Sequence, residues 1–466
     1  MTITSWGFVG FLTIAILAFQ ISPRRWRARV VFPATSLTFI GLVMPSTEAV
    51  GALLGYVGLV WLATEVIFRW PKRTAQVMTV SAALIVFGWI KAYEFLAFLP
   101  LSGRVPATIG LSYILLRSLQ VLIDLAETPS LRPGLPTLFS FLTSWPCLVS
   151  GPIQRYEDFH EQLDSMETFK LSEDVLIASM HRMAKGYFFV LVLADITKHL
   201  WTGLEGIALN HPSPIALAGA QGVFLAHLFF DFSGYTHIVI GAGYLFGLQL
   251  PENFDHPWQS KSFLEFWGRW HMTMSNWFKT YVFNPLLIVL IKRWPGQGMS
   301  YYHGVVAFFL TFFLVGLWHG PTWAYVIDGL LLAIGASANQ IYRMALRRWL
   351  DKKRLDKLSA NRTYVAICAA LTFTYISFSL SMLWLTFDQA RHVVWGYRLS
   401  GLVLAELSLL LMMMFAISII QSLPRAMPWS EHRGWIPIQI GITCAVIDAY
   451  TFLFPAFGGA FFYEKF

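Results

Sequence analysis

Long apolar runs recur along almost the whole chain and limit its possible folds more than any other feature. The clearest runs cover residues 7–21, 50–68, 180–196, 371–387, 402–420 and 436–454. About 20 helical residues cross a bilayer, and these runs are continuous instead of alternating every second residue, which favours helices over a barrel. Charged residues make up 13% of the chain, about half their share in soluble domains. The sequence therefore predicts an all-α polytopic membrane protein with roughly eleven to thirteen transmembrane or re-entrant helices.

Basic residues gather in three clusters, at residues 24–29, 69–73 and 343–362. Cytoplasmic loops of membrane proteins are enriched in Lys and Arg, so we expect all three clusters at the cytoplasmic face. For the same reason the net charge of +8 does not indicate nucleic-acid binding. A second interpretation is that the clusters attract an anionic donor or carrier to that face.

The polar stretches between the apolar runs are short, and none is long enough to fold alone. We expect residues 1–466 to form one membrane domain, with N-terminal helices in 1–104, a central part in 105–330 and C-terminal helices in 331–466. No internal repeat is recognised, which counts against transporter folds built from duplicated halves. Cys147, Cys368 and Cys444 lie in apolar sequence without metal-ligand spacing, so we expect neither a disulfide framework nor a bound metal.

Two histidines stand in apolar, tryptophan-rich sequence. His271 follows FWGRW, and His319 lies in GLWHGPTW, where Gly320 and Pro321 open the helix at the imidazole. Ionisable groups at membrane depth are costly, rare and usually functional. Imidazole is the side chain best suited to transfer a proton near neutral pH. The pair therefore predicts chemistry carried out within the membrane.

Residues 228–285 hold the densest polar content within otherwise apolar sequence. Asp231, Ser233 and Tyr235 fall within two turns of one predicted helix, with Asp231 and Tyr235 on the same face. Two roles stay open for Asp231, which either bonds a neighbouring helix or orients a catalytic group. We expect the aromatic segment 266–271 to lie along the membrane interface or to line a cavity. The segment 145–160 carries two prolines and turns abruptly polar, which predicts a broken or re-entrant helix.

Six segments of the chain match, in order, the motifs of one known family. They are 110–113 (GLSY) with Asp124, 150–159 (SGPIQRYEDF), 230–235 (FDFSGY), 251–254 (PENF), 266–271 (FWGRWH) and 317–320 (LWHG). On these segments the chain resembles the membrane-bound O-acyltransferase family, in the bacterial branch that includes proteins of alginate O-acetylation and teichoic acid D-alanylation. The aromatic end at 461–466 looks like the family's terminal motif. The resemblance implies helices that surround a central tunnel.

The resemblance also implies roles for individual residues. His319 would be the catalytic histidine and His271 the second functional polar position, which is commonly asparagine in eukaryotic members. Substrate-binding roles are expected for a further set of side chains. They are Asp231, Ser233, Tyr235, Arg269, Asn276 and Trp318. The chain departs from the branch at His237 and Gly268, which leaves the donor and the acceptor open.

The implied activity is transfer of an acyl group from a cytoplasmic thioester to hydroxyls of an exported or cell-envelope polysaccharide. We expect acetyl in preference to D-alanyl; the first alternative is a D-alanyl transferase that uses an acylated carrier protein. An alternative of another class is a non-catalytic transporter or scaffold for an acyl donor. No tightly bound cofactor is expected, since the donor, acetyl-CoA or an acylated phosphopantetheine carrier, is a co-substrate. The resemblance places the chain in the bacterial inner membrane, with an extracytoplasmic acyltransferase as a further partner.

One mechanism fits these residues. A hydroxyl is a weak nucleophile at neutral pH and needs a positioned base, for which His319 is our hypothesis, while His271 polarises the carbonyl or holds the donor. Arg269 and Lys279 are expected to bind the phosphate of a pantetheine arm, with snorkelling to the interface as the alternative for Lys279. A dry tunnel would suppress hydrolysis of the thioester.

Overall fold

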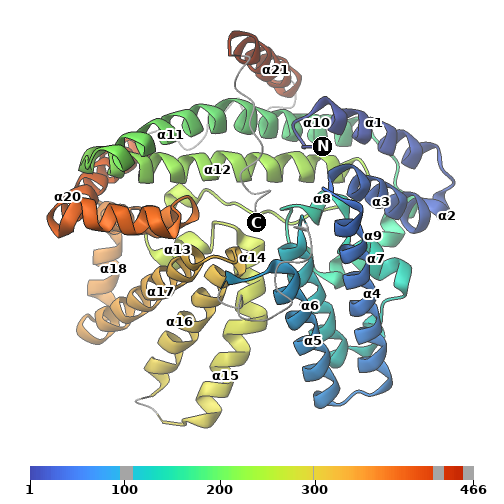
Figure 1. Ribbon diagram of the computed structural model, residues 1–466, viewed down its shortest axis with the longest axis horizontal. Coiled ribbons are helices and arrows are strands. Elements are labelled where there is room, and N and C mark those ends of the chain that lie inside the picture. The colour runs from blue at the N-terminus through green and yellow to red at the C-terminus, as the bar shows by residue number, and fades with distance from the viewer. Residues whose placement is uncertain (95–108, 297–298, 423–434, 455–466) are drawn as a thin grey trace. The chain divides into compact units, whose positions relative to one another are not determined.

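The structure is a computed structural model that describes residues 1–94, 109–296, 299–422 and 435–454 (Figure 1). The terminal motif at 461–466 lies outside the described residues. No β-strand occurs in the described ranges, where the only ladder-type contact is an isolated bridge between Phe254 and Trp270. The structure confirms the predicted all-α class.

The chain divides into two compact units that do not follow chain order. The first comprises Met1–Val192, Asp231–Glu252 and Glu431–Phe466, and the second Leu193–Phe230 and Asn253–Ser430. The helices wholly within the first unit are α1 (Trp6–Ile21), α2 (Arg24–Trp26), α3 (Phe32–Val43), α4 (Thr47–Arg69), α5 (Arg73–Lys91), α6 (Leu111–Glu127), α7 (Leu135–Leu142), α8 (Trp145–Leu148), α9 (Tyr156–Thr168), α10 (Glu173–Phe188) and α21 (Ile436–Leu453). The helix α12 (Pro214–Tyr244) begins in the second unit and ends in the first.

The other helices belong to the second unit. They are α11 (Asp195–Asn210), α13 (Phe263–Trp267), α14 (Met272–Phe278), α15 (Asn284–Arg293), α16 (Ser300–His319), α17 (Trp323–Trp349), α18 (Lys352–Ala360), α19 (Arg362–Leu380) and α20 (Phe387–Ser422).

Nine helical segments in the described ranges are long and apolar enough to span a membrane. They are Thr47–Arg69, Arg73–Lys91, Glu173–Asn210, Pro214–Tyr244, Tyr302–His319, Trp323–Trp349, Arg362–Leu383, Phe387–Ile420 and Ile436–Leu453. The first predicted run forms the shorter apolar helix α1. The run predicted at 371–387 begins earlier, because its helix is capped by Asn361. A polytopic helical membrane protein is thus confirmed.

In the first unit α4, α5 and α6 pack together (Figure 1). The buried Glu65 of α4 accepts both arms of the Arg132 guanidinium, with Nη2 at 2.7 Å from each carboxylate oxygen. The same guanidinium lies 4.1 Å from the centre of the Phe68 ring. A bidentate pair of this kind is stronger and more directional than a single contact, so it fixes the segment that follows α6 onto α4.

The predicted break after Trp145 is present. The helix α8 ends after one turn at Leu148, and the chain is not helical again until α9 begins at Tyr156. The buried Arg117 of α6 donates to the carbonyls of Phe141 and Cys147, at 2.8 and 3.3 Å. These carbonyls lie at the ends of α7 and α8, where no intrahelical donor is available. The guanidinium therefore supplies a hydrogen-bond donor to a carbonyl near the end of each of these two short helices.

Candidate active site

His319 is the last residue of α16, because Gly320 adopts an extended backbone and Pro321 cannot continue the hydrogen-bond ladder. A Cβ atom at residue 320 would overlap the Tyr325 ring, so only glycine lets this ring cover the helix end. The imidazole is 5% exposed. The predicted opening of the helix at the imidazole is present.

The helices α16 and α17 pack along each other (Figure 1). Their backbones lie in close contact at two glycines. A Cβ atom on Gly316 would overlap the backbone of Gly329, and one on Gly329 would lie 2.7 Å from the Phe313 carbonyl. This close approach brings Asp328, the neighbour of Gly329, against His319. The distance from His319 Nδ1 to Asp328 Oδ2 is 2.9 Å.

The contact with Asp328 decides which imidazole nitrogen of His319 is able to accept a proton. A carboxylate oxygen accepts hydrogen bonds, so His319 Nδ1 carries the proton and donates a hydrogen bond to Asp328. The lone pair of the imidazole is then on Nε2. Asp328 is fully buried, at 0% exposure. When Nε2 takes up a proton, the imidazolium lies beside an acceptor of opposite charge, as in a Ser-His-Asp triad. The pair is thus arranged to take and return one proton.

Sequence reasoning did not select Asp328, although a signal was present. It stands in the apolar run AYVIDGLLLAIG, and an ionisable residue at membrane depth is a functional candidate by default. The two histidines are conspicuous because tryptophans surround them, whereas Asp328 has no such motif and lies nine residues beyond His319 on the next helix.

His271 lies in a loop and not within a helix. It precedes α14 as the N-cap residue with a left-handed backbone, at φ 43° and ψ 52°. Its ring is 2% exposed and stacks on Trp318, with ring centres 6.1 Å apart. Burial, and next the charge of the nearby His319, hold the pKa of His271 well below its usual value. At neutral pH His271 is therefore an uncharged imidazole.

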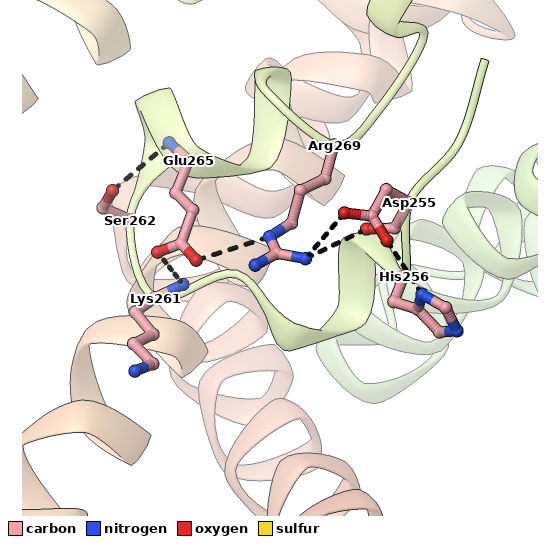
Figure 2. Close-up of polar contacts among 6 residues, drawn as sticks. All are labelled: Asp255, His256, Lys261, Ser262, Glu265 and Arg269. Carbon is pink, nitrogen blue, oxygen red and sulfur yellow. Dashed lines mark hydrogen bonds and ion pairs between the residues drawn. The ribbon is translucent and has the colours of Figure 1, made fainter. Parts of the chain in front are cut away.

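The structure places Arg269 between two carboxylates (Figure 2). Its Nη1 lies 3.3 Å from Asp255 Oδ2, and its Nε lies 3.4 Å from Glu265 Oε1. The hydrogen bond from His256, and also the charge of Arg269, lower the pKa of Asp255, so it is ionised at neutral pH. The guanidinium that we expected on a donor phosphate is thus engaged within the protein.

The remaining predicted side chains divide between the two units. Trp318 lies with the two histidines, whereas Asn276 is exposed on α14. Asp231, Ser233 and Tyr235 are buried on α12 within the first unit. There the Ser150 N–H donates to the Tyr235 hydroxyl at 3.3 Å. The structure thus groups His271, Trp318 and His319, and it adds Asp328.

The tryptophans of the aromatic segment, Trp267 and Trp270, are buried within the second unit, as is Trp277 on α14, so none of the three is exposed as a residue at the membrane interface would be. Trp270 stacks on Phe266 with ring centres 5.3 Å apart. Among the described residues, no three His, Cys, Asp or Glu side chains gather as metal ligands would.

Comparison with known proteins gives one family and two kinds of relative. The model of the MBOAT, membrane-bound O-acyltransferase family, matches residues 72–383, which include His271, His319 and Asp328. Teichoic acid D-alanyltransferase of Bacillus subtilis is 30% identical over 274 residues, which are 58% of this chain and 67% of that protein. That of Streptococcus thermophilus is 28% identical over 375 residues, 75% of this chain and 88% of that protein. The probable alginate O-acetylase AlgI of Azotobacter vinelandii is 28% identical over 345 residues, which are 68% of this chain and 64% of that protein.

The low pKa of His271 predicts how acid affects stability. In the unfolded chain this imidazole has an ordinary pKa of about 6.5, whereas folded it stays neutral well below that pH. Below about pH 6.5 the unfolded state binds the extra proton, so the free energy of unfolding falls by up to about 1.4 kcal/mol per pH unit. We expect thermal unfolding in detergent between pH 7.5 and 5.5 to show a larger loss for the wild type than for His271→Asn. Equal losses would contradict a neutral buried His271.

Proposed function

The chain belongs to the membrane-bound O-acyltransferase family, and from this membership we propose that it transfers a small acyl group from a cytoplasmic thioester to hydroxyls of an exported or cell-envelope polysaccharide. The observation that carries the proposal is the buried pair of His319 and Asp328, at 2.9 Å, within the matched region. A buried base with an orienting carboxylate is what activation of a hydroxyl requires.

The reaction would proceed by direct attack. His319 Nε2 takes the hydroxyl proton as the oxygen attacks the thioester carbonyl, and Asp328 stabilises the imidazolium that forms. When the C–S bond breaks, the imidazolium returns the proton to the thiolate, so the products are an ester and a thiol. A positioned base of this type contributes about 10²–10⁴-fold to the rate.

His271 would act without changing its charge. A neutral imidazole can donate one hydrogen bond to the carbonyl oxygen as negative charge develops there, and loss of such a donor costs about 10²–10³-fold in rate. The low pKa of His271 supports this role, because a charged imidazolium beside His319 would disfavour protonation of the base. The two histidines then divide the work of base and oxyanion donor.

Two acyl groups remain candidates. Our sequence-based preference for a group other than D-alanyl is not supported, since the relatives include D-alanyltransferases as well as probable alginate O-acetylases. Acetyl is our first proposal, supported by the probable alginate O-acetylases among the relatives; the six motifs themselves are common to both kinds of protein. D-alanyl is the second, because a D-alanyltransferase aligns over 88% of its own length.

We place the donor at the face that carries the basic cluster. The cluster joins the end of α17 to the start of α19 through α18, and all eight of its basic residues are exposed. They are Arg343, Arg347, Arg348, Lys352, Lys353, Arg354, Lys357 and Arg362. Such a surface suits the phosphates of coenzyme A or an acidic carrier protein. The positive-inside rule predicts that this surface is cytoplasmic, and we propose that the membrane is a bacterial inner membrane. An extracytoplasmic acyltransferase would receive or complete the transfer.

The first test compares wild type and His319→Ala, purified in detergent and supplied with a polysaccharide acceptor and its extracytoplasmic partner, with radiolabelled acetyl-CoA and with a labelled D-alanyl carrier protein. We expect thiol release from one donor by the wild type and a loss of about 10²–10⁴-fold in the variant. The donor that turns over names the acyl group. His211→Ala, at an exposed histidine between α11 and α12, is the matched control and should keep full activity.

Two results would contradict the proposal. Full activity of a folded His319→Ala protein would remove His319 as the base. Binding of either donor without thiol release by the wild type, with a polysaccharide acceptor and its extracytoplasmic partner present, would favour the transporter or scaffold alternative.

The role of the Asp328 carboxylate can be tested by replacing it with an amide. In Asp328→Asn the amide can donate to Nδ1 and so favour the tautomer in which Nε2 carries the proton, which is the wrong form for a base. We expect the rate of transfer to fall by about 10²–10⁴-fold, with little change in donor KM. Asp448→Asn, at an exposed carboxyl on α21, is the control. A folded Asp328→Asn protein with wild-type turnover would show that the carboxylate does not orient His319.

A further inference from the structure

His271 has a backbone conformation that a histidine rarely adopts without support. Its φ of 43° lies in the left-handed region, where the Cβ atom of an L-residue crowds the following carbonyl. Such a conformation persists where surrounding contacts determine it, and functional sites are common places for it. The contacts that hold the backbone of His271 are therefore candidates for residues that position its imidazole.

His271 also precedes a helix without capping it. The first N–H groups of a helix need acceptors, which the N-cap side chain commonly supplies. The imidazole makes no such bond to α14. The N–H groups of Met272 and Thr273 are instead satisfied from a distant part of the chain.

The distant acceptor is Asn253, which lies twenty residues before Thr273 in the chain. Its backbone carbonyl accepts from the Met272 N–H at 2.9 Å. Its side-chain Oδ1 accepts from the Thr273 hydroxyl at 2.7 Å and from the Thr273 N–H at 3.3 Å. Asn253 is fully buried, at 0% exposure. It thus caps α14 in place of His271, whose ring is left to stack on Trp318.

The chain on the other side of His271 is held by the same loop. The Asp255 N–H donates to the Arg269 carbonyl at 2.9 Å, and Phe254 forms the isolated bridge with Trp270. The ion pairs of Arg269 with Asp255 and Glu265 close this end (Figure 2). Backbone bonds from residues 253–255 therefore fix residues 269–273 both before and after His271.

We propose that Asn253 is a positioning residue for His271, acting as a remote cap that holds the left-handed backbone and aims the imidazole at the reacting carbonyl. This inference rests on the proposed function for its kinetic consequence, but not for its structural one. Asn253 itself is enclosed by protein and does not touch the substrate.

The kinetic test compares two substitutions at residue 253. Asn253→Ala removes Oδ1 and should lower kcat by about 10–100-fold with little change in donor KM, since a small misplacement of a reacting group has effects of this size. Asn253→Asp keeps an acceptor for Thr273 and should retain most of the activity. Gln259→Ala, at an exposed amide in the same loop, is the control. Combining Asn253→Ala with His271→Ala should add no further loss, because the first change acts through the second residue.

A readout without turnover separates this inference from the proposed function. Histidines labelled at Cε1 are followed by NMR in detergent, and the His271 signal is identified by its loss in His271→Asn. We expect Asn253→Ala to shift this signal and to let it titrate nearer pH 6.5, whereas the control Gln259→Ala leaves it unchanged. An unmoved His271 signal in folded Asn253→Ala would overturn the positioning role. A moved signal in a protein that transfers no acyl group would uphold it and overturn the proposed function instead.

Discussion

The crossing of α16 and α17 at Gly316 and Gly329 is the constraint on which the site depends. An isolated carboxylate in apolar surroundings is costly, and it becomes tolerable when a partner accepts its charge or proton. The glycines remove the side chains that would separate the helices, so Asp328 reaches His319 at 2.9 Å. Asp328 Oδ2 thereby accepts the hydrogen bond of His319 Nδ1, and the lone pair of the imidazole lies on Nε2.

The two histidines reach their places by different means. His319 ends a long helix and is oriented by a side chain on the next helix. His271 lies at the start of a short helix and is oriented by backbone bonds to residues 253–255. Different environments can give two groups of one kind different roles, as when acid and base functions are separated in enzymes, and the roles that we propose for the two histidines use this difference. Burial keeps His271 neutral, whereas His319 has a carboxylate ready for its charged form.

The sequence predicted the fold class and the histidine pair because both depend on local pattern. Apolar runs predict spanning helices, and an imidazole among tryptophans is conspicuous in one short window. The partners of these histidines depend on long-range geometry. Nothing near Asn253 in the sequence indicates that it caps α14, and Arg269 was assigned to a phosphate although two carboxylates hold it. The exposure of Asn276 depends on which face of α14 packs inward, and the seven residues of this helix, about two turns, do not determine that face from the sequence alone.

The left-handed backbone at residue 271 also limits which side chains can serve there. Asparagine and histidine belong to the small group of residues, glycine apart, that enter this region with some frequency, whereas β-branched residues are nearly excluded. Of this group, histidine and asparagine also carry an N–H donor that stays uncharged at neutral pH when buried. The left-handed backbone and the hydrogen bond that we propose to the carbonyl therefore favour the same two residues.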